Sequence, residues 1–430
     1  MGTSPWNALW SRDFRLLWTS GAIGNICRWT EMVALLLLVL EMTDSVWWVA
    51  LVGSMRMFPL LAGMFFGLIA DRANRWYIMA LVRSANVLIA AILVALILGG
   101  WINQWHILFA TLAGGWAIAL EQPSRHSFLY HLAGRRNAVR GMSLELVGVT
   151  LGLLVGPLMA GLFIEITGYT GTLIFVLTGY SLALLLNLMV KSRIANASAG
   201  TRSFRRTLVG GLQYSRDNRV VLGVLVVTLV LNFTGFSSIQ LFPVVARNHL
   251  NVGEGLTGVL VSAFGMGTLL GAIVITLLGT VRYHGRVFVT GAALQLLGLV
   301  AFALSDSFVL SYFALLLFGL GGSAFATMQS TILLMSAAPD KRGMSIGLMD
   351  LCIGVGPIGT LQMGAVAGVL STQQAIGIHA AAGLVLLVPI VFLTPLVWRP
   401  TTPDVEESTG QGKPSPDAQP RPDPVSKQAR

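Results

Sequence analysis

Long apolar segments alternate with short polar connections along most of the chain. A helix that spans a bilayer needs about 20 mostly apolar residues. Twelve segments meet this criterion, and they run over 14–40, 46–70, 76–99, 105–130, 140–164, 169–190, 219–245, 256–279, 286–305, 308–334, 343–370 and 375–397. We therefore predict an all-α integral membrane protein with twelve transmembrane helices.

One longer polar connection divides the predicted helices into two sets of six. It covers 191–218 and is rich in Arg, Ser and Gly. From Arg399 the composition changes to Pro, Asp, Ser, Gln and Gly, which cannot bury enough apolar surface to fold. The pattern predicts an N-terminal six-helix bundle over 1–190, a basic linker over 191–218, a C-terminal six-helix bundle over 219–398 and a disordered tail over 399–430.

The two predicted halves resemble each other weakly. The stretch "LVGPLMAG" (154–161) has a counterpart in "GVGPIGT" (354–360), and "GMFFGLIADRANRW" (63–76) has one in "GAIVITLLGTVRYHGR" (271–286). The spacing of about 200 residues fits a duplicated six-helix unit, which is the usual construction of secondary transporters. We therefore expect two pseudo-symmetric six-helix bundles.

The charged residues support this topology. Hydrophobic residues make up 55% of the chain and charged ones only 11%, whereas soluble domains carry about a quarter. Lys and Arg cluster in alternate connections, in the linker and in the tail, while the opposite connections hold only Arg247. By the positive-inside rule, both termini are expected on the cytoplasmic side of the membrane. The net charge of +10 is then a topology signal and gives no support for nucleic-acid binding.

Two opposite charges interrupt the first apolar segment. The stretch "NICRWTEM" places Arg28 and Glu31 three residues apart, on one face of a helix. A charge in a bilayer core is expensive, so such residues are either neutralised by a partner or kept for a function. Arg28 and Glu31 form a structural pair with each other, or Glu31 couples proton entry to substrate release and Arg28 tunes it. The sequence leaves both alternatives open.

Further embedded charges occur in the next four segments. Glu121 and Arg125 are four residues apart and share a helix face, and Glu145 lies at a similar depth, where it can compete for Arg125. We expect a structural pair, with a proton-carrying role of Glu121 or Glu145 as the alternative. Arg56 and Arg83 stand singly, and each needs an acidic or amide partner if it is buried.

Several motifs resemble those of the major facilitator superfamily. "GLIADRANRW" is similar to the loop between its second and third spans, and "GLLVGPLMAG" resembles the fifth-span motif associated with antiporters. "FRLLWTSGAIGN", "QPSRHSFLYHL" and "FRRTLVGGLQYSRDN" look like the bacterial branch that contains enterobactin and macrolide exporters. The resemblance extends to about Leu396, and it implies a place in the inner membrane of a bacterial cell.

The resemblance implies roles for particular residues. It implies a conformational latch in which Asp71 meets the start of the eleventh span, in a set that comprises Asp71, Arg72, Arg75, Arg125 and Asp350. It implies that small residues of the fifth span pack against the partner half and mark exporters, namely Gly152, Gly156, Pro157 and Gly161. It also implies a central cavity lined by spans one, four, seven and ten, with the candidates Asn25, Trp29, Asn232, Phe236, Gln240 and Gln329.

These observations predict a secondary active transporter and no enzyme. No ATP-binding Gly-x-x-x-x-Gly-Lys-Ser/Thr loop is present, so the energy is expected from an ion gradient. The favoured hypothesis is a proton-coupled exporter, an antiporter, of a small amphipathic organic molecule such as a drug or siderophore. The alternatives are an importer of a small organic solute and a transporter-like scaffold or sensor without turnover. The expected partners are the substrate, protons and the lipid bilayer, with no nucleic acid, no cofactor and no metal, and the chain is expected to be a monomer.

Overall fold

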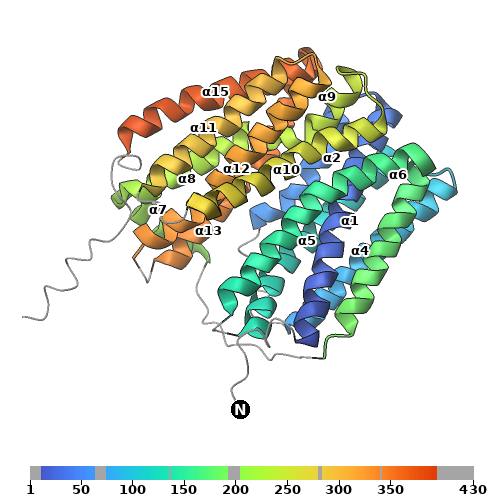
Figure 1. Cartoon of the computed structure of the whole chain (residues 1–430), viewed down its shortest axis with the longest axis horizontal. Coiled ribbons are helices and arrows are strands. Elements are labelled where there is room, and N and C mark those ends of the chain that lie inside the picture. Colours follow the sequence, from blue (N-terminus) through green and yellow to red (C-terminus); the bar gives the residue numbers. More distant parts are fainter. Residues whose placement is uncertain are drawn as a thin grey trace, which may run out of the picture.

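The computed structural model describes residues 11–62, 74–134, 137–191, 204–278, 283–338 and 341–394 (Figure 1). Within these ranges the regular structure is entirely helical, as predicted. Nine helices of the described part are long and apolar enough to cross a membrane. Helix α5 is as long, with 30 residues, but falls outside these nine because its sequence is more polar.

The helices of the first half largely follow the predicted segments. They are α1 (Arg12–Thr43), α2 (Val46–Met57), its 3-10 continuation η1 (Phe58–Ala62), α4 (Arg75–Leu98), α5 (Gln104–Ala133) and α6 (Ala138–Leu188). Helix α6 covers two predicted segments, and Gly168 interrupts it with φ 70°. Glycine adopts this left-handed conformation without steric cost, so the chain turns there between the two segments.

The second half holds the remaining helices. They are α7 (Phe204–Asp217), α8 (Arg219–Thr234), η2 (Phe236–Leu241), α9 (Phe242–Asn248), α10 (Glu254–Leu278), α11 (His284–Ala303), α12 (Phe308–Ser336), α13 (Arg342–Ile353), α14 (Gly356–Val369) and α15 (Thr372–Leu393). Helix α7 lies inside the predicted linker. The predicted segment 343–370 is divided into α13 and α14, and Pro357 stands in the first turn of α14, where a missing backbone N–H is tolerated.

Helices of the two halves approach closely at positions where both carry small residues. Helix α6 contacts α10 at Gly161 and Gly258, and a Cβ on either glycine would collide with backbone of the other helix. Helix α2 contacts α14, where Ala50 lies against Gly364 and the Ser54 hydroxyl donates to the Pro357 carbonyl at 3.2 Å. Small residues allow such close approach between membrane helices.

A polar cluster links the two halves at one end of the molecule. Arg247 of α9 lies 3.2 Å from Glu41 at the end of α1 and 3.6 Å from Glu254 at the start of α10. The Tyr169 hydroxyl of α6 donates to Glu41 at 3.0 Å. Because Glu41 and Tyr169 belong to the first half and Arg247 and Glu254 to the second, these contacts hold the halves together at this end.

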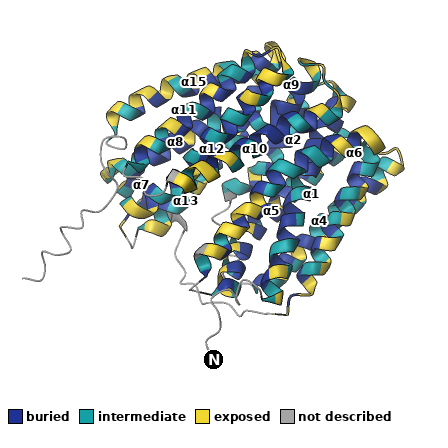
Figure 2. Cartoon of the chain, viewed as in Figure 1, coloured by how far each residue is buried: buried dark blue, intermediate teal, exposed yellow. Residues whose placement is uncertain are grey.

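Burial is distributed as expected for a protein in lipid (Figure 2). Large apolar side chains are exposed on the outer faces, such as Leu277 (81% exposed), Val369 (86%) and Phe392 (74%). The interior, by contrast, contains buried charged residues from the first half. A soluble protein rarely exposes apolar patches of this extent, so the outer faces are suited to contact with lipid chains.

Candidate functional site

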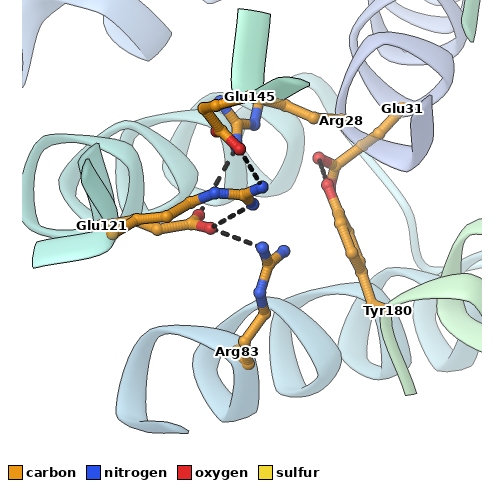
Figure 3. Close-up of polar contacts among 7 residues, drawn as sticks. Arg28, Glu31, Arg83, Glu121, Glu145 and Tyr180 are labelled. Carbon is orange, nitrogen blue, oxygen red and sulfur yellow. Dashed lines mark hydrogen bonds and ion pairs between the residues drawn. The ribbon is translucent and has the colours of Figure 1, made fainter. Parts of the chain in front are cut away.

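A network of buried charges lies inside the first half, between side chains of α1, α2, α4, α5 and α6. Its members are Arg28, Glu31, Arg56, Arg83, Glu121, Arg125, Glu145 and Tyr180. Figure 3 shows six of these residues, Arg28, Glu31, Arg83, Glu121, Glu145 and Tyr180. The charged side chains other than Arg28 are only 1–6% exposed, so none of them reaches bulk water. The cost of burying them must therefore be met by their mutual contacts.

Glu31 does not pair with Arg28. Its Oε2 accepts a hydrogen bond from Arg56 Nη1 at 2.9 Å and another from the Tyr180 hydroxyl at 3.0 Å. Arg28 instead extends towards Glu121 of α5, at 3.5 Å. The predicted pair within α1 is therefore wrong, because neighbouring helices place other partners within reach of each side chain. Arg56 has the acidic partner that its burial requires.

Glu121 is the centre of the network. Its Oε1 accepts from Arg83 at 2.5 Å and lies 3.8 Å from Arg125 Nη1, and its Oε2 lies 3.5 Å from Arg28. The predicted contact between Glu121 and Arg125 is thus present but is the longest of the three. Arg125 makes its shortest ion pair with Glu145 of α6, at 2.6 Å, so the predicted competition of Glu145 for Arg125 is confirmed.

Two glycines of α1 make room for arginines of other helices. A Cβ on Gly21 would overlap the guanidinium of Arg125, and a Cβ on Gly24 would overlap that of Arg83. No sequence motif pointed to a role for these glycines or for Tyr180. The only sequence signal was the short spacing of small residues in "GAIG" just before Asn25, which also fits plain helix packing.

The network carries a surplus of positive charge. Four guanidinium groups, those of Arg28, Arg56, Arg83 and Arg125, face three carboxylates when all groups are ionised. Some donors of the network also lack an acceptor. Three buried guanidinium nitrogens have no hydrogen-bond partner among the described residues, namely Arg56 Nε, Arg83 Nη1 and Arg125 Nη1.

A cavity of about 180 Å³ adjoins the network. Its lining comes from α1, α2, η1, α5 and α6, and it includes charged, polar and apolar side chains. The lining residues are Asn25, Arg28, Trp29, Met32, Arg56, Met57, Leu60, Ile118, Glu121, Gln122, Arg125, His126, Glu145 and Val149. The structure therefore places the predicted cavity residues Asn25 and Trp29 at this cavity, and it adds Gln122 and His126.

The candidates from the second half do not belong to the described lining. Asn232 donates to the Thr228 carbonyl at 2.9 Å, and Gln329 donates to the Thr228 hydroxyl at 2.6 Å. Phe236 packs against Phe318 and Phe325. The side chain of Gln240 lies against Gly53 of α2. These side chains are engaged in packing and hydrogen bonds and do not line this cavity, so their role in a central cavity between the halves stays a prediction.

The proposed latch is only partly visible. Asp71 and Arg72 lie outside the described residues. Arg75 is buried at the start of α4, and Asp350 is exposed on α13 and forms no ion pair with any described residue. Arg125 belongs to the buried network, so a link between Arg125 and Asp350 is wrong.

The small residues of the fifth-span motif face two different neighbours. Gly152 lies against Asn25, and Gly156 lies against Trp29 and Thr30, so both pack on α1 within the first half. Gly161 and the Pro157 carbonyl face α10. The motif was expected to pack against the partner half. This is correct for Pro157 and Gly161, and it is wrong for Gly152 and Gly156.

Among the described residues, no group of three or more His, Cys, Asp and Glu side chains is arranged to hold a metal ion. The site itself brings ion pairs, hydrogen bonds and carboxylates together beside a cavity.

The chain is similar to known membrane transporters. The staphyloferrin A transporter of Staphylococcus aureus is 21% identical over 383 residues, which are 86% of this chain and 93% of that protein. A bacterial homologue of the human lysosomal transporter Spinster, inward-facing and occupied, superposes with a TM-score of 0.67 at 15% identity and covers 92% of this chain and 98% of its own. A POT family transporter in complex with 5-aminolevulinic acid superposes with a TM-score of 0.70 at 14% identity. The match covers 90% of this chain and 97% of that transporter.

The family comparison extends over nearly the whole sequence. Residues 3–414 match the model of a family described as transmembrane secretion effectors. The relatives and structural neighbours are transporters rather than enzymes. The chain belongs to the transmembrane secretion effector family and is a membrane transporter of the major facilitator type.

Proposed function

We propose that this protein is a proton-coupled exporter of a small organic molecule, such as a drug or a siderophore. The observation that carries the proposal is the buried network of carboxylates and arginines beside the cavity. Ionisable groups inside a membrane protein typically mark ion or substrate pathways. The secretion described for the family and the staphyloferrin A transported by one relative support the direction and the kind of substrate.

The architecture that we propose has twelve spans in two six-helix bundles. The nine apolar helices give twelve spans when α6 is divided at Gly168 and when α2 and α5 are added. The bundles alternate between states open at opposite ends, and the Arg247 cluster closes one end. Both termini lie in the cytoplasm and the helices in the bacterial inner membrane, as the charge pattern predicts. The latch formed by Asp71, Arg72 and Arg75 is part of this proposal.

We infer that Glu145 is the proton-coupling acid. It faces the cavity, and Arg125 is its single partner among the described ion pairs. Glu121 also faces the cavity, but three arginines already surround its carboxylate. Glu31 lies outside the described lining and is held by Arg56 and Tyr180. Among the three carboxylates of the network, Glu145 is therefore the one that lines the cavity with a single charged partner.

The proposal is tested with purified protein in proteoliposomes that contain a pH-sensitive dye. A proton gradient is imposed, and enterobactin, a macrolide or staphyloferrin A is added. We expect at least one compound to accumulate against its gradient while protons move in the opposite direction. Movement of compound and protons in the same direction would establish import, and accumulation that is unaffected by collapse of the gradient would refute proton coupling.

A further inference from the structure

The surplus positive charge of the network is concentrated at Arg28. Arg83 and Arg56 have short ion pairs, at 2.5 and 2.9 Å, and their side chains are at most 3% exposed. Arg28 makes a single ion pair, in which its Nη2 lies 3.5 Å from an oxygen of Glu121. The same Glu121 carboxylate is already bound by Arg83. The side chain of Arg28 is 18% exposed. Arg28 is therefore the guanidinium whose charge the protein compensates least.

A second guanidinium with free bonding capacity faces the same cavity. Arg125 is 3% exposed, and its Nη1 has no hydrogen-bond partner among the described residues; the Glu121 oxygen is 3.8 Å away. A buried donor without an acceptor is unfavourable, more so when the group is charged, so this atom gains from any acceptor that enters the cavity. Arg28 and Arg125 both line the cavity, and Asn25 and Gln122 add amide groups to its wall.

Two carboxylates also face this space, and they restrict what can bind. Glu121 and Glu145 repel an anion, but each is already paired with an arginine at 2.6 Å or less, through Arg83 and Arg125 respectively. The net charge of the group still favours one added negative charge. The apolar part of the wall, with Trp29 and Met57, accepts a hydrocarbon portion beside that charge.

The size of the cavity indicates which part of a ligand it holds. Its volume is about 180 Å³, below the ~300–1,000 Å³ of pockets that enclose drug-sized molecules. It therefore fits a head group or a small acid. Guanidinium groups bind carboxylates through two parallel hydrogen bonds, which suits a planar acid group better than a neutral one.

We propose that the transported substrate is an organic acid and that Arg28 binds its carboxylate, with Arg125 as a second donor. This inference rests on the proposed transport function and adds the substrate class. The bound carboxylate replaces the long contact of Arg28 with Glu121 and compensates the surplus charge of the network.

The test measures binding to the purified full-length protein in detergent by thermal shift at constant ionic strength. The probes are citrate, its neutral trimethyl ester and inorganic phosphate. We expect citrate to stabilise the protein and the ester not to. Arg28→Gln should weaken citrate binding about 10- to 100-fold, the loss of a charge-assisted bond, while Arg28→Lys retains part of the affinity. The exposed Arg219→Gln serves as the matched control and should bind citrate as the wild type does.

Stability separates a binding role from a structural one. Because Arg28 is the surplus cation, Arg28→Gln should melt at the wild-type temperature without ligand, whereas Arg83→Gln should melt lower. Equal stabilisation by citrate and its ester, equal binding of phosphate and citrate, or unchanged citrate binding by Arg28→Gln would each overturn the proposal.

The transport assay distinguishes failure of the proposed carboxylate site from failure of the proposed proton-coupled export. Uphill export of a neutral macrolide that is unchanged in Arg28→Gln would leave proton-coupled export standing and refute the organic-acid site. Arg28-dependent citrate binding without proton-coupled movement of any test compound would support the site and refute the proposed coupling.

Discussion

At the residue scale, each buried charge depends on a partner from another helix. Glu31 takes its two hydrogen bonds from Arg56 of α2 and Tyr180 of α6. Arg125 is shared between Glu145 and Glu121 at 2.6 and 3.8 Å. Removal of one member of such a pair leaves the other charge buried without compensation. Because the partners differ from one carboxylate to the next, replacing Glu31 and replacing Glu145 are expected to have different effects on stability and on transport.

Glu31→Gln is expected to destabilise the protein. It leaves the Arg56 guanidinium, which is 3% exposed, without an anionic partner, and breaking a buried pair costs about 3–5 kcal/mol of unfolding free energy. The measurement is the melting temperature in detergent. Adding Arg56→Met to Glu31→Gln should restore most of the loss, whereas adding Arg28→Met should not. Rescue by Arg28→Met alone would show that Arg28 is the true partner of Glu31.

Glu145→Gln is expected to abolish uphill export while preserving exchange, and to lower the melting temperature as well, because Arg125 then keeps only Glu121, at 3.8 Å, as an anionic partner. The amide keeps the size of the side chain but cannot bind and release a proton, and exchange of substrate across the membrane needs no net proton transfer. Both rates are measured in the same proteoliposomes. Asp306→Asn changes an exposed acid that pairs with His249 in the second half and should export normally. Uphill export by a stable Glu145→Gln protein would remove this residue from the coupling mechanism.

At the element scale, α1 contacts the rest of the first half through small residues. Gly21 and Gly24 hold the guanidinium groups of Arg125 and Arg83, and Gly152 and Gly156 of α6 bring that helix against α1. The glycines therefore do more than permit close helix packing. They leave the space in which charges from α4 and α5 reach the centre of the network.

Gly24→Ala is expected to displace Arg83 from Glu121. An added methyl group in a filled interior costs about 1–3 kcal/mol, and here it also disturbs the shortest ion pair of Glu121. The measurement is again the melting temperature. Gly368→Ala in α14 is the control, because no atom lies within 4 Å of its Cβ position and alanine favours helix. Equal melting temperatures for Gly24→Ala and Gly368→Ala would contradict the role assigned to Gly24.

At the scale of the whole molecule, the two halves are joined at one end by polar contacts. Arg247 of the second half contacts Glu41 of the first, and Tyr169 reinforces Glu41. Nearby, α6 and α10 approach at Gly161 and Gly258. Arg247 and Glu41 are partly exposed, at 32% and 50%, so their pair is worth little more than about 0–1 kcal/mol. An interaction of this size holds an end closed without preventing it from opening.

Arg247→Gln is expected to shift the equilibrium towards opening at this end. The shift should be about twofold to fivefold, the population change that corresponds to ~1 kcal/mol. It is measured as the distance distribution between spin labels at Thr43→Cys and Asn248→Cys, after Cys27 and Cys352 are replaced by serine. Asp306→Asn breaks an exposed pair within the second half and should leave the distribution unchanged. An identical distribution in Arg247→Gln would show that the cluster does not control opening.

The sequence alone determined the properties that depend on local composition. Twenty or so apolar residues in a row predict a membrane helix wherever the helix later packs, and the all-helical structure of the described residues agrees. The presence of Arg28, Glu31, Glu121 and Glu145 inside apolar segments is also a local property. It was sufficient to indicate the region of the candidate site.

The tertiary structure alone decided the partners of Glu31 and the contact of Arg83 with Glu121. Arg56 lies 25 positions from Glu31, Arg83 lies 38 from Glu121, and Tyr180 lies 149 from Glu31, so no spacing rule for a helix connects them. The spacing of Arg28 and Glu31 permits a pair within α1, but a long side chain on a packed helix also reaches its neighbours. The choice between these partners is made by the packing of α2, α4, α5 and α6 around α1, which no single segment encodes.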